Sequence, residues 1–155
     1  MRNIYFLAPL VGIILLCIIP GKTYSQDVIP TQLYSAAEIP DSLKTDANSI
    51  VRYSLDEITI KGPGEAVIKH HKLVTILNEK GDREAIVALF YNRKYDSFSD
   101  IVFHIYNADG VMVKKYHKSD MYDGAAIDDE TMVTDDRFLG LKHVPTSYPT
   151  TIEIE

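Results

Sequence analysis

A predicted β-hairpin over residues 101–116, with the sequence IVFHIYNADGVMVKKY, decides the fold of this 155-residue chain. In its first half, apolar residues alternate with more polar ones, as in a strand that packs on one face. Asp109-Gly110 is a strong signal for a tight hairpin turn, because such turns need residues that tolerate positive φ. Val111–Tyr116 supplies the partner strand. The sequence therefore predicts an antiparallel pair at this point.

A second hairpin is predicted upstream, within residues 50–77. Ile50–Ile60 is rich in β-branched residues, and Gly62-Pro63-Gly64 is a strong turn signal before the apolar segment Ala66–Leu77. The apolar positions of the first segment change parity midway, which predicts a β-bulge near Asp56-Glu57. We expect these two segments to pair antiparallel.

Further strands are predicted on both sides of these hairpins. Ala85–Tyr91 is continuously apolar, which fits a helix or a buried strand, and its short length favours the strand. Leu139–Val144 is one more short strand, and Thr150–Glu155 alternates with strand periodicity. Ser119–Asp136 has no such pattern and is predicted to be a loop. Short strands without a long helix predict an all-β fold, an antiparallel β-sandwich over residues 49–155.

The last predicted strand ends without a turn, because its alternation continues to Glu155. We therefore expect an incomplete sandwich, cut before its last strands. Thr150–Glu155 would then be an exposed edge, and the apolar face of Ile101, Phe103 and Ile105 would be incompletely covered. Such a domain is expected to be marginally stable and to associate.

The N-terminus predicts export. Residues 1–25 combine Arg2, a mostly apolar run and small residues before Gln26, which is typical of a cleaved signal peptide; an uncleaved anchor is the alternative. Residues 26–48 are predicted to be a linker with a short helix that Asp41 caps and whose Leu43 faces inward. The expected location is the periplasm or the cell surface, with membrane contact only through the signal peptide before cleavage.

Composition excludes several functions. The formal net charge is −6, so the surface repels a phosphate backbone, and no nucleic acid partner is expected. The single cysteine, Cys17, lies within the predicted signal peptide. The mature chain would thus lack a cysteine nucleophile, a disulfide and thiolate ligands for zinc.

The five histidines form no known catalytic or zinc motif by their spacing. They are His70, His71, His104, His117 and His143. His104 and His117 flank the central hairpin turn and could approach each other across the strands, but packing or surface roles are the favoured interpretation. The chain also has no tryptophan to form a sugar platform. We predict no catalytic residue and no cofactor.

The predicted loop 119–136 is strongly acidic and contains no lysine or arginine before Arg137. Its carboxylates could hold calcium, which prefers six to eight oxygen ligands, although the spacing matches no EF-hand. A solvated surface loop is the favoured interpretation. The candidate metal ligands in this segment are Asp128, Asp129, Glu130, Asp135 and Asp136.

Four segments, in their order and spacing, resemble one family. They are IPDSLKTDANSIVRYSLDEITI (39–60), HHKLVTILNEKGD (70–82), YNADGVMVKKYHKSDM (106–121) and YPTTIEIE (148–155). The family is an uncharacterised β-rich domain that precedes a transglutaminase-like core in exported Bacteroidota proteins. The resemblance implies a downstream partner domain with a Cys-His-Asp triad for papain-like chemistry. No residue of that triad can be assigned within this chain.

Two functional hypotheses follow. The first is a non-catalytic N-terminal accessory domain of an exported transglutaminase-like protein, which positions the core or binds a surface polypeptide. The alternative is an envelope module that binds glycan or calcium through the acidic loop 119–136.

Overall fold

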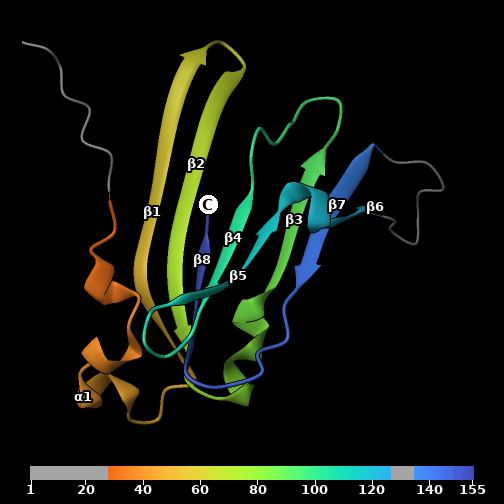
Figure 1. The fold of residues 1–155 in the computed structure, drawn as a ribbon. Helices are drawn as coiled ribbons and strands as arrows, with labels where there is room; N and C mark the ends of the chain where they lie inside the picture. The colour runs from red at the N-terminus through yellow and green to blue at the C-terminus, as the bar shows by residue number, and fades with distance from the viewer. Residues whose placement is uncertain (1–27, 127–134) are drawn as a thin grey trace, which may run out of the picture.

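The computed structural model describes residues 28–126 and 135–155, which form two antiparallel sheets (Figure 1). The five-stranded sheet has the order β1 (Ser49–Gly62), β2 (Glu65–Ile76), β8 (Thr150–Ile154), β4 (Val102–Tyr106), β5 (Met112–His117). The three-stranded sheet has the order β3 (Ile86–Asn92), β7 (Asp136–Lys142), β6 (Tyr122–Ala125). The short helices are η1 (Thr31–Leu33), η2 (Ala36–Glu38), α1 (Asp41–Lys44), η3 (Glu79–Ala85) and η4 (Lys118–Asp120). The all-β prediction is confirmed. Within the described ranges, no helix has the length and apolar character needed to cross a membrane.

Both predicted hairpins are present. β4 pairs with β5, and Gly110 in their turn has a φ of 80°, which a side chain at this position would disfavour. β1 pairs with β2 around a turn in which Gly64 has a φ of 81°. The predicted strand at residues 85–91 is confirmed as β3, and the one predicted at residues 139–144 overlaps β7, which begins earlier and ends at Lys142.

The predicted β-bulge near Asp56-Glu57 is wrong. Those residues pair regularly with His70 and Lys69, and the irregularities fall at Val51/Tyr53 and Ile60/Gly62 instead. The side chain of Arg52, at the first irregularity, donates a hydrogen bond from its Nη1 to the carbonyl of Ser35, 3.1 Å away. The position of the bulge therefore coincides with the packing of a distant segment, which local parity does not reveal.

The final strand is central, which corrects the expectation that Thr150–Glu155 is an exposed edge. β8 pairs with β2 on one side and with β4 on the other. Ile101, Phe103 and Ile105 are buried, so the prediction of an incompletely covered face at these residues is also wrong. A strand inserted between two hairpins takes part in backbone pairing on both sides, and this pairing is invisible in its own short sequence.

The main core lies between the two sheets. Its buried members alternate along the strands, as the apolar patterns indicate. They are Val74 and Ile76 of β2, Ala85, Val87 of β3, Phe103 and Ile105 of β4, Leu141 of β7 and Ile152 of β8.

The segment before β1 packs on the five-stranded sheet. Ile29, Ala36 and Ile39 are buried, and the Ala36 amide donates to the Ala108 carbonyl in the β4–β5 turn at 2.9 Å. The predicted helix is present as α1, but it is a single turn preceded by Pro40 without a side-chain cap, and Leu43 is exposed rather than inward. The predicted signal peptide, residues 1–25, lies outside the described residues.

The predicted loop 119–136 contains more structure than expected. Its described part includes the end of η4 and the strand β6, which pairs with β7. β6 contains only four residues, with Gly124 among them, so its sequence carries no alternating apolar signal. Residues 127–134 lie outside the described residues.

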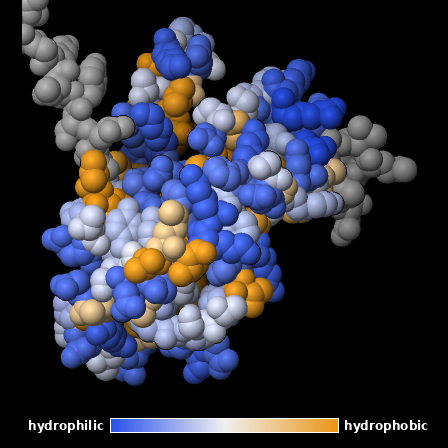
Figure 2. Space-filling view, viewed as in Figure 1, coloured by the Kyte–Doolittle hydropathy of each residue, from blue (hydrophilic) through white to orange (hydrophobic). Residues whose placement is uncertain are grey.

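The far end of the β1–β2 hairpin projects beyond the rest of the sheet, because β8 pairs with β2 only at residues 72–76 (Figure 1). Ile58, Ile60 and Ile68 are exposed there, on one face of the hairpin. Apolar side chains reach the surface near its tip (Figure 2).

Candidate functional site

The acidic residues predicted as metal ligands do not form one described cluster. Asp128, Asp129 and Glu130 lie outside the described residues. Asp135 contacts Arg93 at 3.1 Å, and Asp136 accepts a hydrogen bond from the Asn92 side chain at 2.8 Å. A calcium or glycan site in the loop stays a prediction.

The two histidines of the β4–β5 hairpin are not opposite each other. His117 pairs with Val102, and His104 pairs with Lys115 on one side and Glu153 on the other. The Nδ1 atom of His104 lies 3.1 Å from Oε2 of Glu153. This histidine therefore belongs to a different cluster, which the structure reveals around Glu153.

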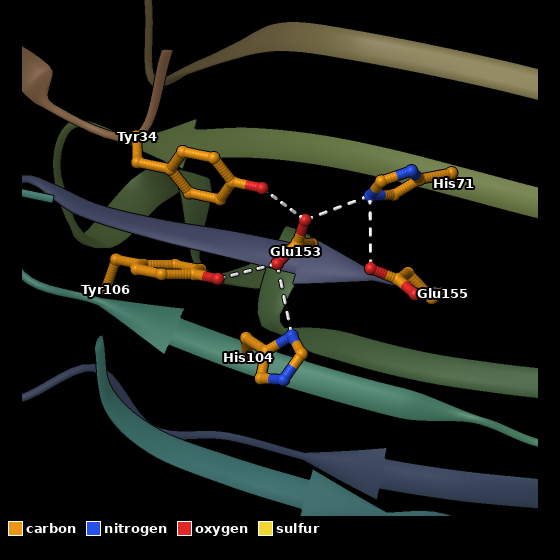
Figure 3. A network of polar contacts seen from close by, with 6 residues as sticks. All are labelled: Tyr34, His71, His104, Tyr106, Glu153 and Glu155. Carbon is orange, nitrogen blue, oxygen red and sulfur yellow. Dashed lines mark hydrogen bonds and ion pairs between the residues drawn. The ribbon is translucent and has the colours of Figure 1, made fainter. Parts of the chain in front are cut away.

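Glu153 is a buried carboxylate on the central strand of the five-stranded sheet (Figure 3), and it lies on the face opposite the main core. Its neighbour Ile152 points into the core, so strand alternation turns Glu153 to the other face. Only 3% of the residue is exposed. A charge this deeply buried requires partners.

Four side chains surround the carboxylate and donate to it. The Tyr34 hydroxyl donates to Oε1 at 2.6 Å, and the Tyr106 hydroxyl donates to Oε2 at 2.6 Å. Nε2 of His71 lies 2.9 Å from Oε1, and Nδ1 of His104 contacts Oε2. Because an ionised carboxylate can only accept, each histidine carries its proton on the nitrogen that faces Glu153. The donors come from β2, β4 and the segment before β1 (Figure 3).

These contacts shift the acidity of the groups in the cluster. Burial by itself would raise the pKa of Glu153, but hydrogen bonds from Tyr106, Tyr34 and His71 and the charge of His104 outweigh it and lower the pKa. Burial, together with the hydrogen bond to Glu153, raises the pKa of Tyr34 and of Tyr106. Glu153 is therefore ionised, and both tyrosines are protonated donors at neutral pH.

The cluster is chemically a saturated acceptor. Both oxygens of Glu153 have two donors, so the carboxylate is a poor general base in this arrangement.

The buried hydroxyls of Thr75 and Thr151 also pair with each other on this sheet, at 2.8 Å. One part of the cluster is more open: Nε2 of His71 also lies 3.4 Å from Oε1 of Glu155, whose side chain is half exposed. His71, Glu153 and Glu155 are the group that could hold a metal ion within the described residues.

Sequence reasoning did not find this cluster. Tyr34, His71, His104 and Glu153 are spread over most of the chain and share no motif. The available signal was the alternation of Glu153 with Ile152 and Ile154, which suggests a partnered charge only if the strand is known to be central.

A second notable surface is the outer face of the three-stranded sheet, here called the aromatic face. Phe90 pairs with Phe138 across β3 and β7, and the ring of Tyr122 lies 5.7 Å from that of Phe138. Phe90 is 73% exposed and Tyr122 is 68% exposed. Ile86 extends the face along β3 and is also exposed. The other members are small. Ala88 lies between Ile86 and Phe90 on the same face of β3, Gly140 pairs with Ala88 and with Tyr122, and Gly124 pairs with Phe138.

The glycines of the aromatic face make room for its rings. A Cβ atom on Gly124 would lie 2.6 Å from Cε1 of Tyr122 and 3.0 Å from Cε1 of Phe138. The rings therefore lie over bare backbone and form a broad apolar surface. Exposed apolar patches of this kind can mark protein–protein interaction sites, membrane interaction sites or ligand-binding grooves.

The fold and these two features define an all-β domain with a buried, fully partnered carboxylate and an exposed aromatic sheet face. The family model of the Domain of Unknown Function DUF3857 matches residues 62–155, and the chain belongs to this family. No curated protein and no solved structure matches the chain.

Proposed function

We propose that this chain is a non-catalytic accessory domain of an exported protein, and that it holds a neighbouring transglutaminase-like domain or a surface polypeptide against its aromatic face. The observation that carries the proposal is the exposure of Phe90, Tyr122 and Ile86 on one side of a small sheet. Aromatic residues are enriched in the centres of protein interfaces, where they bury a large area at low entropic cost.

The chemistry of the described residues supports a binding role. The most buried ionisable group, Glu153, has its acceptor sites occupied by four donors. The cysteine that papain-like chemistry requires occurs in this chain only as Cys17, within the predicted signal peptide. Under this proposal, the catalytic residues belong to the partner domain, and the location is the periplasm or the cell surface.

A binding experiment with matched variants tests the proposal. The proposed transglutaminase-like partner domain is produced separately, and its affinity for the chain is measured by isothermal titration calorimetry. Phe90→Ser removes a central ring of the aromatic face and should weaken binding at least about tenfold, as hot-spot truncations do. Ile60→Ser changes an equally exposed apolar residue on the projecting hairpin and should leave the affinity unchanged.

Two results would contradict the proposal. Binding that is insensitive to Phe90→Ser, or that is lost equally with Ile60→Ser, would remove the aromatic face as the docking surface. Peptidase or acyl-transfer turnover by the chain alone, retained through every purification step, would show that the domain is itself catalytic.

A further inference from the structure

We propose that His71, Glu153 and Glu155 form a binding site for one divalent transition metal ion, with zinc as the best fit. Nε2 of His71 lies 2.9 Å from Oε1 of Glu153 and 3.4 Å from Oε1 of Glu155. The three ligand atoms all lie within 4.8 Å of one another. One nitrogen and two carboxylate oxygens thus lie close together, with His71 in contact with both glutamates (Figure 3).

The two carboxylates that face Nε2 of His71 favour a divalent cation between them over the single proton of the imidazole. A neutral imidazole offers only one proton from Nε2, yet two carboxylates approach this atom. The cationic partners that Glu153 has among the described residues are His71 and His104, whose charge depends on protonation. A divalent ion would replace the shared proton and neutralise both glutamates, while Tyr34, Tyr106 and His104 keep their bonds to Glu153.

The two distances from Nε2 of His71 suit a small tetrahedral ion, and the two carboxylate oxygens lie within 4.8 Å of each other. Zinc binds histidine nitrogen and carboxylate oxygen at about 2.0–2.2 Å, so its ligand atoms lie about 3.3 Å apart in a tetrahedron. The observed 3.4 Å between His71 and Glu155 already matches, and the 2.9 Å hydrogen bond to Glu153 would open by a few tenths of an ångström. Calcium, which needs six to eight oxygens, fits this mixed set of three ligands poorly.

The surroundings hold the three ligands in place. Oε2 of Glu153 is fixed by Tyr106 and His104, an arrangement that resembles the outer-shell bonds that orient metal ligands in proteins. The backbone of Glu155 makes two hydrogen bonds with Val102, at 2.9 and 3.0 Å. The ring of Tyr53 packs edge-on against His71, with centroids 5.3 Å apart.

The half-exposed side chain of Glu155 leaves an open side through which an ion can enter and keep a water ligand. Three protein ligands with one position left for water differ from closed structural zinc sites, in which four protein ligands surround the ion. This site departs from the sequence-based expectation that the chain needs no cofactor.

Isothermal titration of the metal-free, tag-free chain with zinc chloride tests the proposal. We expect saturable binding of one ion per chain. Glu155→Gln keeps the size of the side chain and leaves Glu153 and its donors intact, and it should weaken binding at least about tenfold, since losing an outer-shell partner alone costs about 10–100-fold. His71→Ala should abolish binding. His70→Ala is the matched control, because this neighbouring histidine is exposed, pairs with Asp56 and should not affect the affinity.

Absorption spectroscopy with cobalt(II) provides a second measurement of binding that does not depend on the heat of binding. A tetrahedral site with nitrogen and oxygen ligands should give visible absorption bands that Glu155→Gln removes and His70→Ala retains. The proposal is overturned if the chain shows no saturable zinc binding, if Glu155→Gln binds as tightly as the unaltered chain, or if His70→Ala weakens binding as much as Glu155→Gln does. Circular dichroism of each variant shows whether the fold is kept, and Glu155→Gln remains decisive if His71→Ala unfolds.

Discussion

Replacing Glu153 with glutamine should destabilise the domain far more than a change of one polar atom on the surface would. Glutamine keeps one acceptor oxygen, which can still serve two of the four donors, and turns an NH2 group toward the other two. A tyrosine hydroxyl can rotate and accept, but a histidine N–H cannot without changing its tautomer. The histidine that faces the new NH2 group must therefore change its tautomer or lose its bond to residue 153, and the charge-assisted character of the remaining bonds is lost.

The expected magnitude follows from these losses. A hydrogen bond to a charged group contributes about 1.5–3 kcal/mol, and an unsatisfied buried donor costs about 1–3 kcal/mol. We expect Glu153→Gln to lower the free energy of unfolding by about 2–4 kcal/mol, which corresponds to a decrease in Tm of about 8–16 °C for a domain of this size. Urea unfolding followed by circular dichroism, with a check that the m-value is unchanged, measures the difference.

Two further variants sharpen this measurement. Glu155→Gln alters a half-exposed carboxylate of the same strand and should change the stability of the metal-free chain by less than about 1 kcal/mol. Tyr34→Phe removes the donor from the segment before β1, and in a double-mutant cycle its effect should be strongly coupled to that of Glu153→Gln. If Glu153→Gln stays within about 0.5 kcal/mol of the unaltered chain, the usual range of neutral surface substitutions, the buried cluster does not stabilise the fold as argued.

Three more sets of substitutions test other parts of the structure. Ile152→Ala should cost about 2–5 kcal/mol in urea unfolding because the side chain is fully buried between the sheets, whereas the exposed Ile60→Ala should cost less than about 0.5 kcal/mol. Thr75→Val or Thr151→Val alone should cost about 1–3 kcal/mol by leaving the other hydroxyl unpaired, and the double variant should recover most of that loss; equal and additive costs would contradict the pairing. Burial and the charge of the neighbouring Lys114 lower the pKa of His143 in the folded chain. Below the unfolded-state pKa of about 6.5, the unfolded chain therefore binds more protons than the folded chain, and stability falls as the pH decreases. His143→Gln should flatten the pH dependence of unfolding between about pH 7 and 5, and an unchanged slope would exclude this histidine.

The sequence by itself determined the local pieces of this fold. Alternation in residues 101–106 and Asp109-Gly110 predicted the β4–β5 hairpin, and Gly62-Pro63-Gly64 predicted the turn between β1 and β2. These signals are local, because side-chain alternation and turn conformation depend on residues a few positions apart. The same reasoning predicted an all-β fold and selected a strand over a helix for β3.

Only the tertiary structure decided how these pieces are arranged. The strand Thr150–Ile154 carries no information about its neighbours, and its place between β2 and β4 turned an expected edge into the centre of the sheet. Glu153 is buried and partnered only because that position brings His71, His104 and the distant Tyr34 to one carboxylate. The physical reason is that strands pair through backbone N–H and C=O groups, which every residue except proline has in the same form. The order of the strands is therefore selected by packing over the whole domain rather than by any one segment.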